Sequence, residues 1–273
     1  PAERVMPPVV YRLPGMENVR VIENMNYSET QNPHLLMDAY VPAGLPAGVR
    51  PPVALLIHGA GSVEYNAKNW GIFRSWGRLI AAAGMVGVTF THRLGYPKPL
   101  LREGAADLRN AIEFVRASAN SWNADADRMA LVAWSGAGPL LANAMREKPA
   151  FIRCLAVFYA WLDIQDSEPH LQHESPEIVR EFSPVACLET GGASMIPIFI
   201  ARAGLDEIPT MNASIDRFVA AAISANAPVT FMNHPSGEHG FDSQNDSARS
   251  REIVRAALAF LRTHLGVADE QGA

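Results

Sequence analysis

Cysteine is scarce in this sequence, which has two cysteines, Cys154 and Cys187, among 273 residues. So few thiols argue against a disulfide framework as the source of stability. Neither cysteine belongs to a CxxC pair or to a cluster with histidine, so we expect no zinc site of that kind. The chemistry inferred below needs no metal and no organic cofactor. Cys154 stands in the apolar run CLAVFYA, which predicts a buried thiol.

Concentrated positive charge is also missing. The formal net charge is -5 and no Lys/Arg cluster interrupts the chain, which argues against nucleic acid and anionic membrane surfaces as partners. No apolar run approaches the roughly 20 residues that a membrane-spanning helix requires, so we expect no membrane span. The chain begins at Pro1 and shows no leader pattern. A soluble cytoplasmic protein and an exported protein whose leader has been removed remain alternatives, and a homodimer remains open.

What the sequence does have is a repeated alternation of strand, loop and helix patterns. Hydrophobic residues make up 48% of the chain, and no linker rich in Gly, Ser and Pro divides it, so we predict one domain over 1–273. The candidate strands are 19–26, 35–41, 53–58, 85–91, 129–134, 154–159, 196–202 and 228–234. Helical patterns at 104–118, 213–224 and 247–265 alternate with them. This order predicts a doubly wound α/β fold with a mostly parallel, eight-stranded sheet.

The polarity of the strands predicts where each one lies. The middle strands are continuous apolar runs, which is typical of parallel strands covered by helices on both faces. The strands at 19–26 and 35–41 carry more polar residues and fit an exposed antiparallel edge.

One segment, 161–185, interrupts the alternation because it is polar and contains three prolines. We interpret it as a small cap insertion at the end of the sheet where ligands bind. His170 and His173 stand i, i+3 within it. Without a third ligand nearby, solvated loop histidines are favoured over a metal pair.

Residues 131–138, LVAWSGAG, place Ser135 where an apolar strand turns at once into small residues. A nucleophile elbow has this form, because its tight and strained turn requires small neighbours. The usual pattern is G-x-S-x-G, whereas the outer positions here are Ala133 and Ala137, with a glycine after the serine and another after Ala137. On this stretch alone, a nucleophile and a helix N-cap serine are equally good interpretations.

Two later strands supply the partners that such a serine would need. Asp206 follows the strand at 196–202, and His239 follows the strand at 228–234. The carboxyl ends of parallel strands meet at one edge of a sheet, so Ser135, Asp206 and His239 can converge there as nucleophile, orienting acid and base. Asp163 also follows a strand and is an alternative acid, but its place in the insertion favours a polar surface role.

The loop after the strand at 53–58 has the sequence HGAG. Small residues allow backbone N–H groups to point into a cleft, where they can hold a developing oxyanion. The alternative is an ordinary glycine-rich turn. We expect His58 to be a scaffold for the oxyanion loop and not an acid or base.

These motifs together resemble the α/β-hydrolase-fold serine esterases, in particular the carboxylesterase and feruloyl-esterase-like group, which overlaps with dienelactone-hydrolase-like proteins. The stretches that carry the resemblance are LLMDAYVP (35–42), LLIHGAG (55–61), THRLGYP (91–97), GAADLRNAIEFVR (104–116), ADRMALVAWSGAG (126–138), RAGLDEIP (202–209) and GEHGFD (237–242). The resemblance covers the chain from about residue 35 to its end. It implies an α/β-hydrolase fold and hydrolysis of small to medium carboxylic esters through an acyl-enzyme.

The resemblance also implies further roles. The backbone N–H groups of Ala60 and Gly136 would form the oxyanion hole, and Gly59 and Gly61 would line the substrate pocket. From the residues themselves, Trp134 is expected either to form a wall of that pocket or to pack in the core. Asp107 is expected to be a surface or capping charge, and Asp242 is expected to order its loop.

Two other functions remain to be weighed against the esterase. A non-catalytic ligand-binding protein is compatible with the same fold, although all three members of the relay are present. A peptidase-like hydrolase usually has an additional gating domain, for which this length leaves no room. If the cap is the wall of the acyl site, its lack of a long apolar helix predicts a preference for acetyl to butyryl esters over octanoyl esters.

Overall fold

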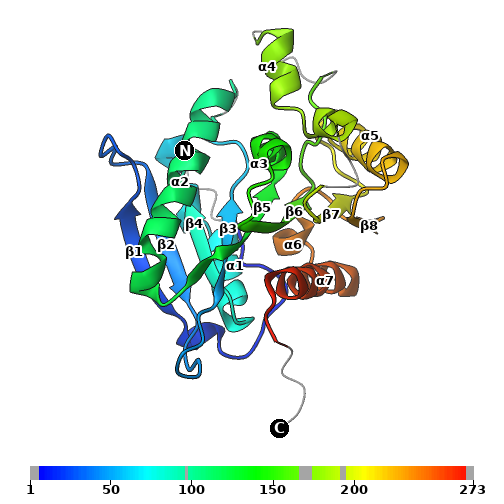
Figure 1. Cartoon of the computed structure of the whole chain (residues 1–273). Coiled ribbons are helices and arrows are strands. Elements are labelled where there is room, and N and C mark those ends of the chain that lie inside the picture. The colour runs from blue at the N-terminus through cyan, green and yellow to red at the C-terminus, as the bar shows by residue number, and fades with distance from the viewer. Residues whose placement is uncertain (1–5, 96–97, 166–173, 191–194, 269–273) are drawn as a thin grey trace.

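A computed structural model describes residues 6–95, 98–165, 174–190 and 195–268, which form an eight-stranded sheet flanked by helices (Figure 1). The strands are β1 (Arg20–Asn26), β2 (Leu36–Val41), β3 (Pro52–Ile57), β4 (Val86–Phe90), β5 (Asp125–Trp134), β6 (Ile152–Phe158), β7 (Ile198–Ala203) and β8 (Val229–His234). Their order across the sheet is β1-β2-β4-β3-β5-β6-β7-β8. β2 pairs antiparallel with both β1 and β4, and the strands from β4 to β8 are parallel. The predicted fold class, the strands and the antiparallel pairing of the first two strands are confirmed. β1 is partly exposed, as expected, but the expected exposure of β2 was wrong, because β2 lies between β1 and β4 and is almost entirely buried.

Helices follow most of the strands. The α-helices are α1 (Gly71–Ala82), α2 (Leu101–Ser118), α3 (Ala142–Glu147), α4 (Pro176–Glu181), α5 (Met211–Ser224), α6 (Phe241–Gln244) and α7 (Ala248–Leu265). The 3₁₀ helices are η1 (Met16–Asn18), η2 (Val63–Tyr65), η3 (Ala67–Asn69), η4 (Ala119–Trp122), η5 (Ser135–Leu141) and η7 (Pro184–Thr190).

The central strand β3 shows why an unbroken apolar run is needed. Leu55 and Ile57 belong to a core cluster that includes residues of α2, α3 and α5, whereas Ala54 and Leu56 belong to a second cluster that includes residues of α1 and α7. Successive side chains of a strand point to opposite faces, so every residue of a doubly covered strand is buried.

The three predicted helices are confirmed, and α2 starts three residues before the predicted 104. α1 was not predicted from the sequence. It has no side-chain N-cap, it begins at Gly71, and it contains Gly77. A Cβ at Gly77 would overlap the ring of Tyr40 on β2. Close packing of α1 against the sheet therefore requires glycine at position 77. Because glycine disfavours helices, its presence hides the helix in the sequence.

Part of the predicted insertion 161–185 can be described. It contains α4, whose N-cap Ser175 accepts a hydrogen bond from the backbone N–H of Ile178. His170 and His173 lie outside the described residues. That this segment forms a cap stays a prediction.

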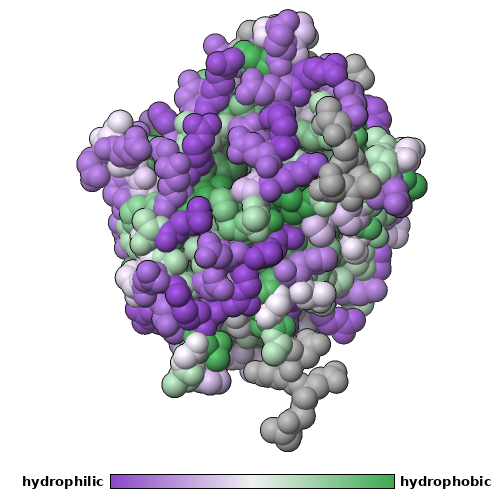
Figure 2. All heavy atoms as spheres, in the orientation of Figure 1, coloured by the Kyte–Doolittle hydropathy of each residue, from purple (hydrophilic) through white to green (hydrophobic). Residues whose placement is uncertain are grey.

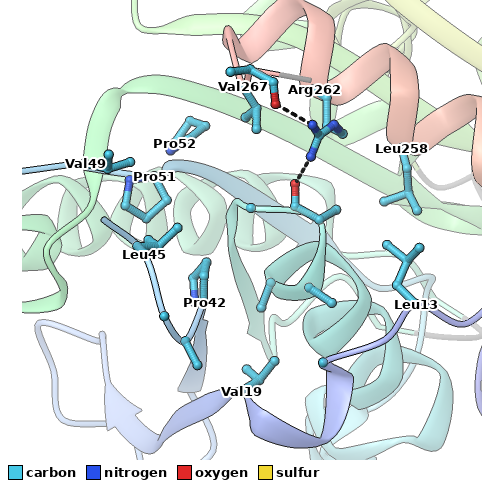
Figure 3. Close-up of a pocket in the computed structure, with 18 of the residues that line it drawn as sticks. Leu13, Val19, Pro42, Leu45, Val49, Pro51, Pro52, Leu258, Arg262 and Val267 are labelled. Carbon is cyan, nitrogen blue, oxygen red and sulfur yellow. Dashed lines mark hydrogen bonds between the residues drawn. The ribbon is translucent and has the colours of Figure 1, made fainter. Parts of the chain in front are cut away.

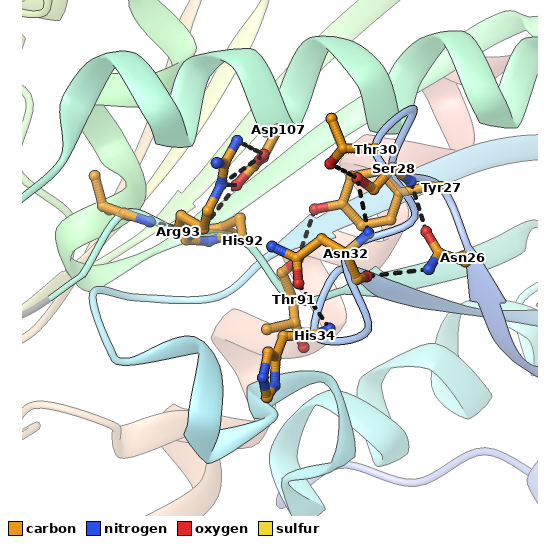
Figure 4. Close-up of polar contacts among 11 residues, drawn as sticks. Asn26, Tyr27, Ser28, Thr30, Asn32, His34, Thr91, His92, Arg93 and Asp107 are labelled. Carbon is orange, nitrogen blue, oxygen red and sulfur yellow. Dashed lines mark hydrogen bonds and ion pairs between the residues drawn. The ribbon is translucent and has the colours of Figure 1, made fainter.

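The loops after β3 and β4 each contribute a cation to a buried carboxylate. The Lys68 ammonium lies 2.8 Å from Asp38, and both side chains are almost fully buried. Arg93 makes a bidentate pair with Asp107, whose side chain is fully buried (Figure 4). The expectation of a surface role for Asp107 was therefore wrong, because the helix turns this carboxylate toward a partner on a distant loop.

A further hydrogen bond connects the β1–β2 turn to the segment just after β4. The Tyr27 hydroxyl donates a hydrogen bond to the carbonyl oxygen of Thr91 at 2.6 Å (Figure 4).

The face seen in Figure 2 is mainly hydrophilic, with hydrophobic residues gathered near its centre. Exposed large hydrophobic side chains are scattered among the described residues and are Val49, Tyr65, Leu100, Leu205, Ile223 and Phe231. No helix in the described part of the chain combines the length and apolarity needed to cross a bilayer.

A broad groove lies at the edge of the sheet where β3 and β4 begin. Its lining comes from the N-terminal segment, the β2–β3 connection and the ends of α1 and α7 (Figure 3). The Arg262 guanidinium borders it and donates a hydrogen bond to the carbonyl oxygen of Ala83 at 2.7 Å. The parallel strands run away from this edge, so the groove lies at the opposite end of the sheet from the loops that follow β3, β5 and β7.

Candidate active site

Three loops meet at the carboxyl edge of the sheet. Ser135 directly follows β5, Asp206 follows β7, and His239 follows β8. The loops after β7 and β8 are joined by two backbone hydrogen bonds, from Gly204 N–H to His234 O and from Leu205 N–H to Gly237 O, both at 2.8 Å. The pairing of parallel neighbours therefore fixes the distance between the acid and the histidine.

The structure brings the three predicted residues into one hydrogen-bonded chain. The His239 Nε2 atom lies 2.9 Å from Ser135 Oγ, and its Nδ1 atom lies 2.7 Å from Asp206 Oδ2. The Asp206 side chain is fully buried, and its other oxygen accepts the N–H of Ile208 at 3.0 Å. A carboxylate accepts hydrogen bonds, so Nδ1 carries the proton and Nε2 faces the serine hydroxyl as an acceptor.

The turn at the serine has the strained backbone that an elbow requires. Ser135 has a φ of 53°, in the left-handed region that non-glycine residues rarely occupy. The alanines at the outer motif positions, Ala133 and Ala137, are fully buried in the core. The positions with no room for a side chain are others: a Cβ at Gly138, for example, would overlap the carbonyl oxygen of Trp161. The glycines of this elbow therefore stand at positions 136 and 138, where the backbone passes closest to neighbouring segments.

The loop after β3 lies directly against the serine. A Cβ at Gly59 would stand 2.9 Å from the Cβ of Ser135, and a Cβ at Gly136 would stand 3.0 Å from the backbone nitrogen of Ala60. The backbones of Ala60 and Gly136, the two residues predicted to hold an oxyanion, are thus neighbours. Gly61 is less confined, because a Cβ there would meet nothing closer than Tyr65 at 3.9 Å.

Behind the histidine lies a buried polar cluster that the sequence did not reveal. Asp242 is fully buried, and its carboxylate accepts hydrogen bonds from Tyr159 Oη at 2.5 Å, Trp76 Nε1 at 2.8 Å and Trp134 Nε1 at 3.0 Å. Burial raises the pKa of Asp242, against the lowering effect of these hydrogen bonds. The Tyr159 ring contacts the imidazole of His239 edge-on, with 4.5 Å between centroids.

This cluster decides between the two roles considered for Trp134. Its side chain is 2% exposed and stacks on Phe158 in the core, with its indole N–H committed to Asp242. Trp134 is therefore a core residue and does not form a pocket wall. The only sequence signal for the cluster was the position of Asp242, three residues after His239.

Asp163 also differs from its expected surface role. It is 4% exposed, pairs with Arg217 at 2.6 Å and accepts the Ser183 hydroxyl at 3.0 Å. Burial raises the pKa of Asp163, but its hydrogen bonds to Gln165 N–H, Arg217 and Ser183 bring about a net lowering. Its partners are those of a structural ion pair, and Asp206 is the acid bonded to His239.

Comparison with known proteins supports the α/β-hydrolase fold. The family model BD-FAE matches residues 37–148. A carbohydrate esterase from gut microbiota is 17% identical with a TM-score of 0.74, over 95% of this chain and 99% of that one. The esterase Est2 of Thermogutta terrifontis, in a butyrate-bound structure, is 19% identical with a TM-score of 0.69, over 95% and 98% of the two chains. Esterase B of Lactobacillus rhamnosis, inhibited by a tributyrin phosphonate, is 16% identical with a TM-score of 0.75, over 94% and 88%.

This chain therefore has the predicted α/β-hydrolase fold, and it is similar to esterases of that fold, as the sequence resemblance predicted. Two curated fungal proteins match shorter segments. The non-reducing polyketide synthase ausA of Aspergillus calidoustus is 32% identical over 127 residues, and the 5-methylorsellinic acid synthase of Aspergillus terreus is 29% identical over 142 residues. The matched segment spans 5% of the length of each of these relatives.

Proposed function

We propose that this α/β-hydrolase cleaves carboxylic esters of small to medium size, with Ser135 as its nucleophile. The observation that carries the proposal is the unbroken relay from the Ser135 hydroxyl through His239 to the buried carboxylate of Asp206, with distances of 2.9 and 2.7 Å. Nucleophile, base and orienting acid within hydrogen-bond reach of one another are the arrangement that acyl transfer requires.

The reaction follows from the positions of these groups. Ser135 Oγ attacks the ester carbonyl carbon while His239 Nε2 removes the hydroxyl proton. The negative charge that develops on the carbonyl oxygen is held by the N–H groups of Gly136 and Ala60. His239 then gives the proton to the alcohol oxygen as the C–O bond breaks, which leaves an acyl-serine. Water repeats the sequence on the acyl-serine and releases the carboxylic acid.

The buried acid has a defined part in this cycle. Asp206 accepts the Nδ1 proton of His239 in a hydrogen bond and so holds the imidazole in the tautomer that can act as a base. When the imidazole gains a second proton, the neighbouring carboxylate stabilises its charge. The Asp206 oxygens point at His239 and at the Ile208 N–H, so this carboxylate is oriented before the reaction starts.

We expect short acyl chains to be preferred. A second possible source of a long apolar groove is the segment 62–76, which contains four aromatic residues. Its residues Phe73 and Trp76 lie on α1, are 4% and 0% exposed, and pack in the core between α1 and the sheet. Tyr65 and Trp70 are the aromatic residues of this segment that lie nearer the surface. Solved structures of the Thermogutta terrifontis esterase contain propionate and butyrate, which is consistent with short acyl groups on this fold.

The test is hydrolysis of p-nitrophenyl acetate by the wild type and by Ser135→Ala, with Ser236→Ala as the control for an exposed serine on the neighbouring loop. Ser135→Ala should lower kcat by roughly 10³-fold or more at an unchanged melting temperature, and Ser236→Ala should stay within a few-fold of the wild type. Hydrolysis by the wild type no faster than in buffer would instead support a ligand-binding protein.

A further inference from the structure

Two histidine rings are stacked beneath the loop that carries Gly59 and Ala60. His58 directly follows β3, and His92 follows β4, the parallel neighbour of β3. Their ring centroids are 3.7 Å apart and their planes differ by 6°. Both residues are at most 1% exposed, and their ring nitrogens are hydrogen-bonded to backbone groups and not to the Ser135 relay. The relay therefore leaves this pair without a role.

The backbone groups around the two rings determine which nitrogen of each carries a proton. His58 Nε2 faces the backbone N–H of His92 at 3.3 Å, and a nitrogen that faces a donor must accept. In the neutral ring the proton is then on Nδ1, which lies 2.6 Å from the carbonyl oxygen of Gly59 and donates to it.

The same reasoning applies to His92. Its Nδ1 faces the backbone N–H of Leu94 at 3.3 Å and must accept, so the proton is on Nε2, which donates to the carbonyl oxygen of His58 at 2.9 Å. Each ring thus has one accepting and one donating nitrogen, matched to a backbone donor and a backbone acceptor. Burial lowers the pKa of both rings, that of His92 to about 4, which keeps the pair neutral.

The hydrogen bond to the Gly59 carbonyl also sets the direction of the Ala60 N–H. The Gly59 carbonyl and the Ala60 N–H belong to the same peptide group, and in a trans peptide these two bonds point in opposite directions. A donor that holds the carbonyl toward the buried rings turns the Ala60 N–H away from them. Gly136 adjoins the Ala60 nitrogen, since a Cβ at Gly136 would stand 3.0 Å from it.

We infer that His58 and His92 are positioning residues that orient the Gly59–Ala60 peptide so that the Ala60 N–H faces the oxyanion. The inference rests on the proposed acyl transfer at Ser135. His58 Nδ1–H fixes the Gly59 carbonyl, and His92 fixes the tautomer of His58 by presenting its own backbone N–H to Nε2. The stacking and the second hydrogen bond, from His92 Nε2 to the His58 carbonyl, hold the two rings in register.

Two substitutions at one position separate this role from simple packing. Asparagine places its amide nitrogen where His58 Nδ1 stands, so His58→Asn keeps a donor to the Gly59 carbonyl. Glutamine places its terminal group where Nε2 stands, so His58→Gln keeps an acceptor for the His92 N–H and loses the donor to Gly59. Both replace a buried ring with a smaller amide, and asparagine leaves the larger cavity, so a packing effect alone would make His58→Asn the less active variant.

We expect kcat for p-nitrophenyl acetate to fall by about 10²-fold in His58→Gln, because one oxyanion donor is no longer held in place, and by less than about 10-fold in His58→Asn. KM should change little in either variant. Inhibition by a boronic acid, whose serine adduct places an oxygen at the oxyanion position, should weaken in parallel with kcat. Equal losses of kcat in the two variants would overturn the inference.

A measurement on the wild type tests the inference even if both variants unfold. Long-range ¹H–¹⁵N correlation spectra of the histidine rings should show the proton of His58 on Nδ1 and that of His92 on Nε2, and the opposite tautomer of His58 would overturn the inference. Failure of the proposed function is distinguishable, because it would appear as an unchanged rate in Ser135→Ala.

Discussion

Gly59 lies so close to Ser135 that a Cβ on Gly59 would stand 2.9 Å from the Cβ of the serine. Real Cβ atoms do not approach this closely, so Gly59→Ala must push the loop away from the nucleophile. We predict a fall in kcat for p-nitrophenyl acetate of roughly 10²-fold, the cost of losing one oxyanion donor. Gly61→Ala is the matched control, because its Cβ would have only an ordinary contact with Tyr65. Equal rates in the two variants would contradict the close approach.

The two candidate acids make different predictions. Asp206→Asn removes the acceptor that holds the His239 tautomer, so kcat should fall by roughly 10³–10⁴-fold with little change in melting temperature. Asp163→Asn removes the charge that pairs with Arg217, so we expect a lower melting temperature and a kcat within a few-fold of the wild type. The opposite pattern would move the orienting acid to the loop after β6.

Asp242 should make stability depend on pH. Burial raises its pKa in the folded protein above the ordinary value of 3.8, so between the two values the folded chain holds a proton that the unfolded chain has lost. The unfolded state then binds fewer protons, and the free energy of unfolding falls as pH rises. This contribution is fully present below pH 3.8 and is lost as pH rises through the folded pKa.

Asp242→Asn lacks that titration. Urea unfolding at a series of pH values should show the stability of the wild type, relative to the variant, declining from about pH 4 upward. Parallel stability profiles for the two proteins would show that Asp242 titrates normally.

The buried ion pair beneath the loop after β3 should contribute to stability. The Lys68 ammonium has hydrogen bonds to Asp38, Asn24 and Asn69. Lys68→Met leaves Asp38 buried without its cation, so we predict a loss of about 3–5 kcal/mol in the free energy of unfolding. Lys98→Met, at an exposed lysine, is the control and should change it by less than about 0.5 kcal/mol. Equal denaturation midpoints would show that water or another donor replaces the ammonium.

Acyl-chain length tests the proposed substrate size. Each buried CH₂ contributes about 0.8 kcal/mol, so a preference for long chains needs a long apolar groove. Because Phe73 and Trp76 are committed to the core, we predict higher kcat/KM for acetyl to butyryl esters than for octanoyl esters. A p-nitrophenyl ester series measures this. A maximum at eight carbons or more would show that Tyr65, Trp70 or residues of the insertion build such a groove.

The sequence predicted the strands, the parallel core of the sheet and its antiparallel edge, because hydrophobic runs and turn residues are local signals. It also selected the serine, acid and histidine that the structure joins, because residues just past parallel strands converge whatever the loops look like. The left-handed serine with small neighbours was likewise readable, although the glycines stand at Gly136 and Gly138 instead of the usual positions.

Other features depended on contacts between distant residues. Asp107, Asp163 and Asp242 look alike in the sequence, yet all three are buried, and the partners of Asp242 include Trp76, which is 166 positions away. A carboxylate is buried only where donors from other elements meet it, and no local pattern encodes that meeting. The tautomers of His58 and His92 have the same origin, since a backbone group on a neighbouring strand end or loop decides which nitrogen holds the proton. The sequence by itself therefore determined which residues reach the edge of the sheet, and the tertiary structure decided how each one is oriented there, because orientation is set by hydrogen-bond partners that only folding brings together.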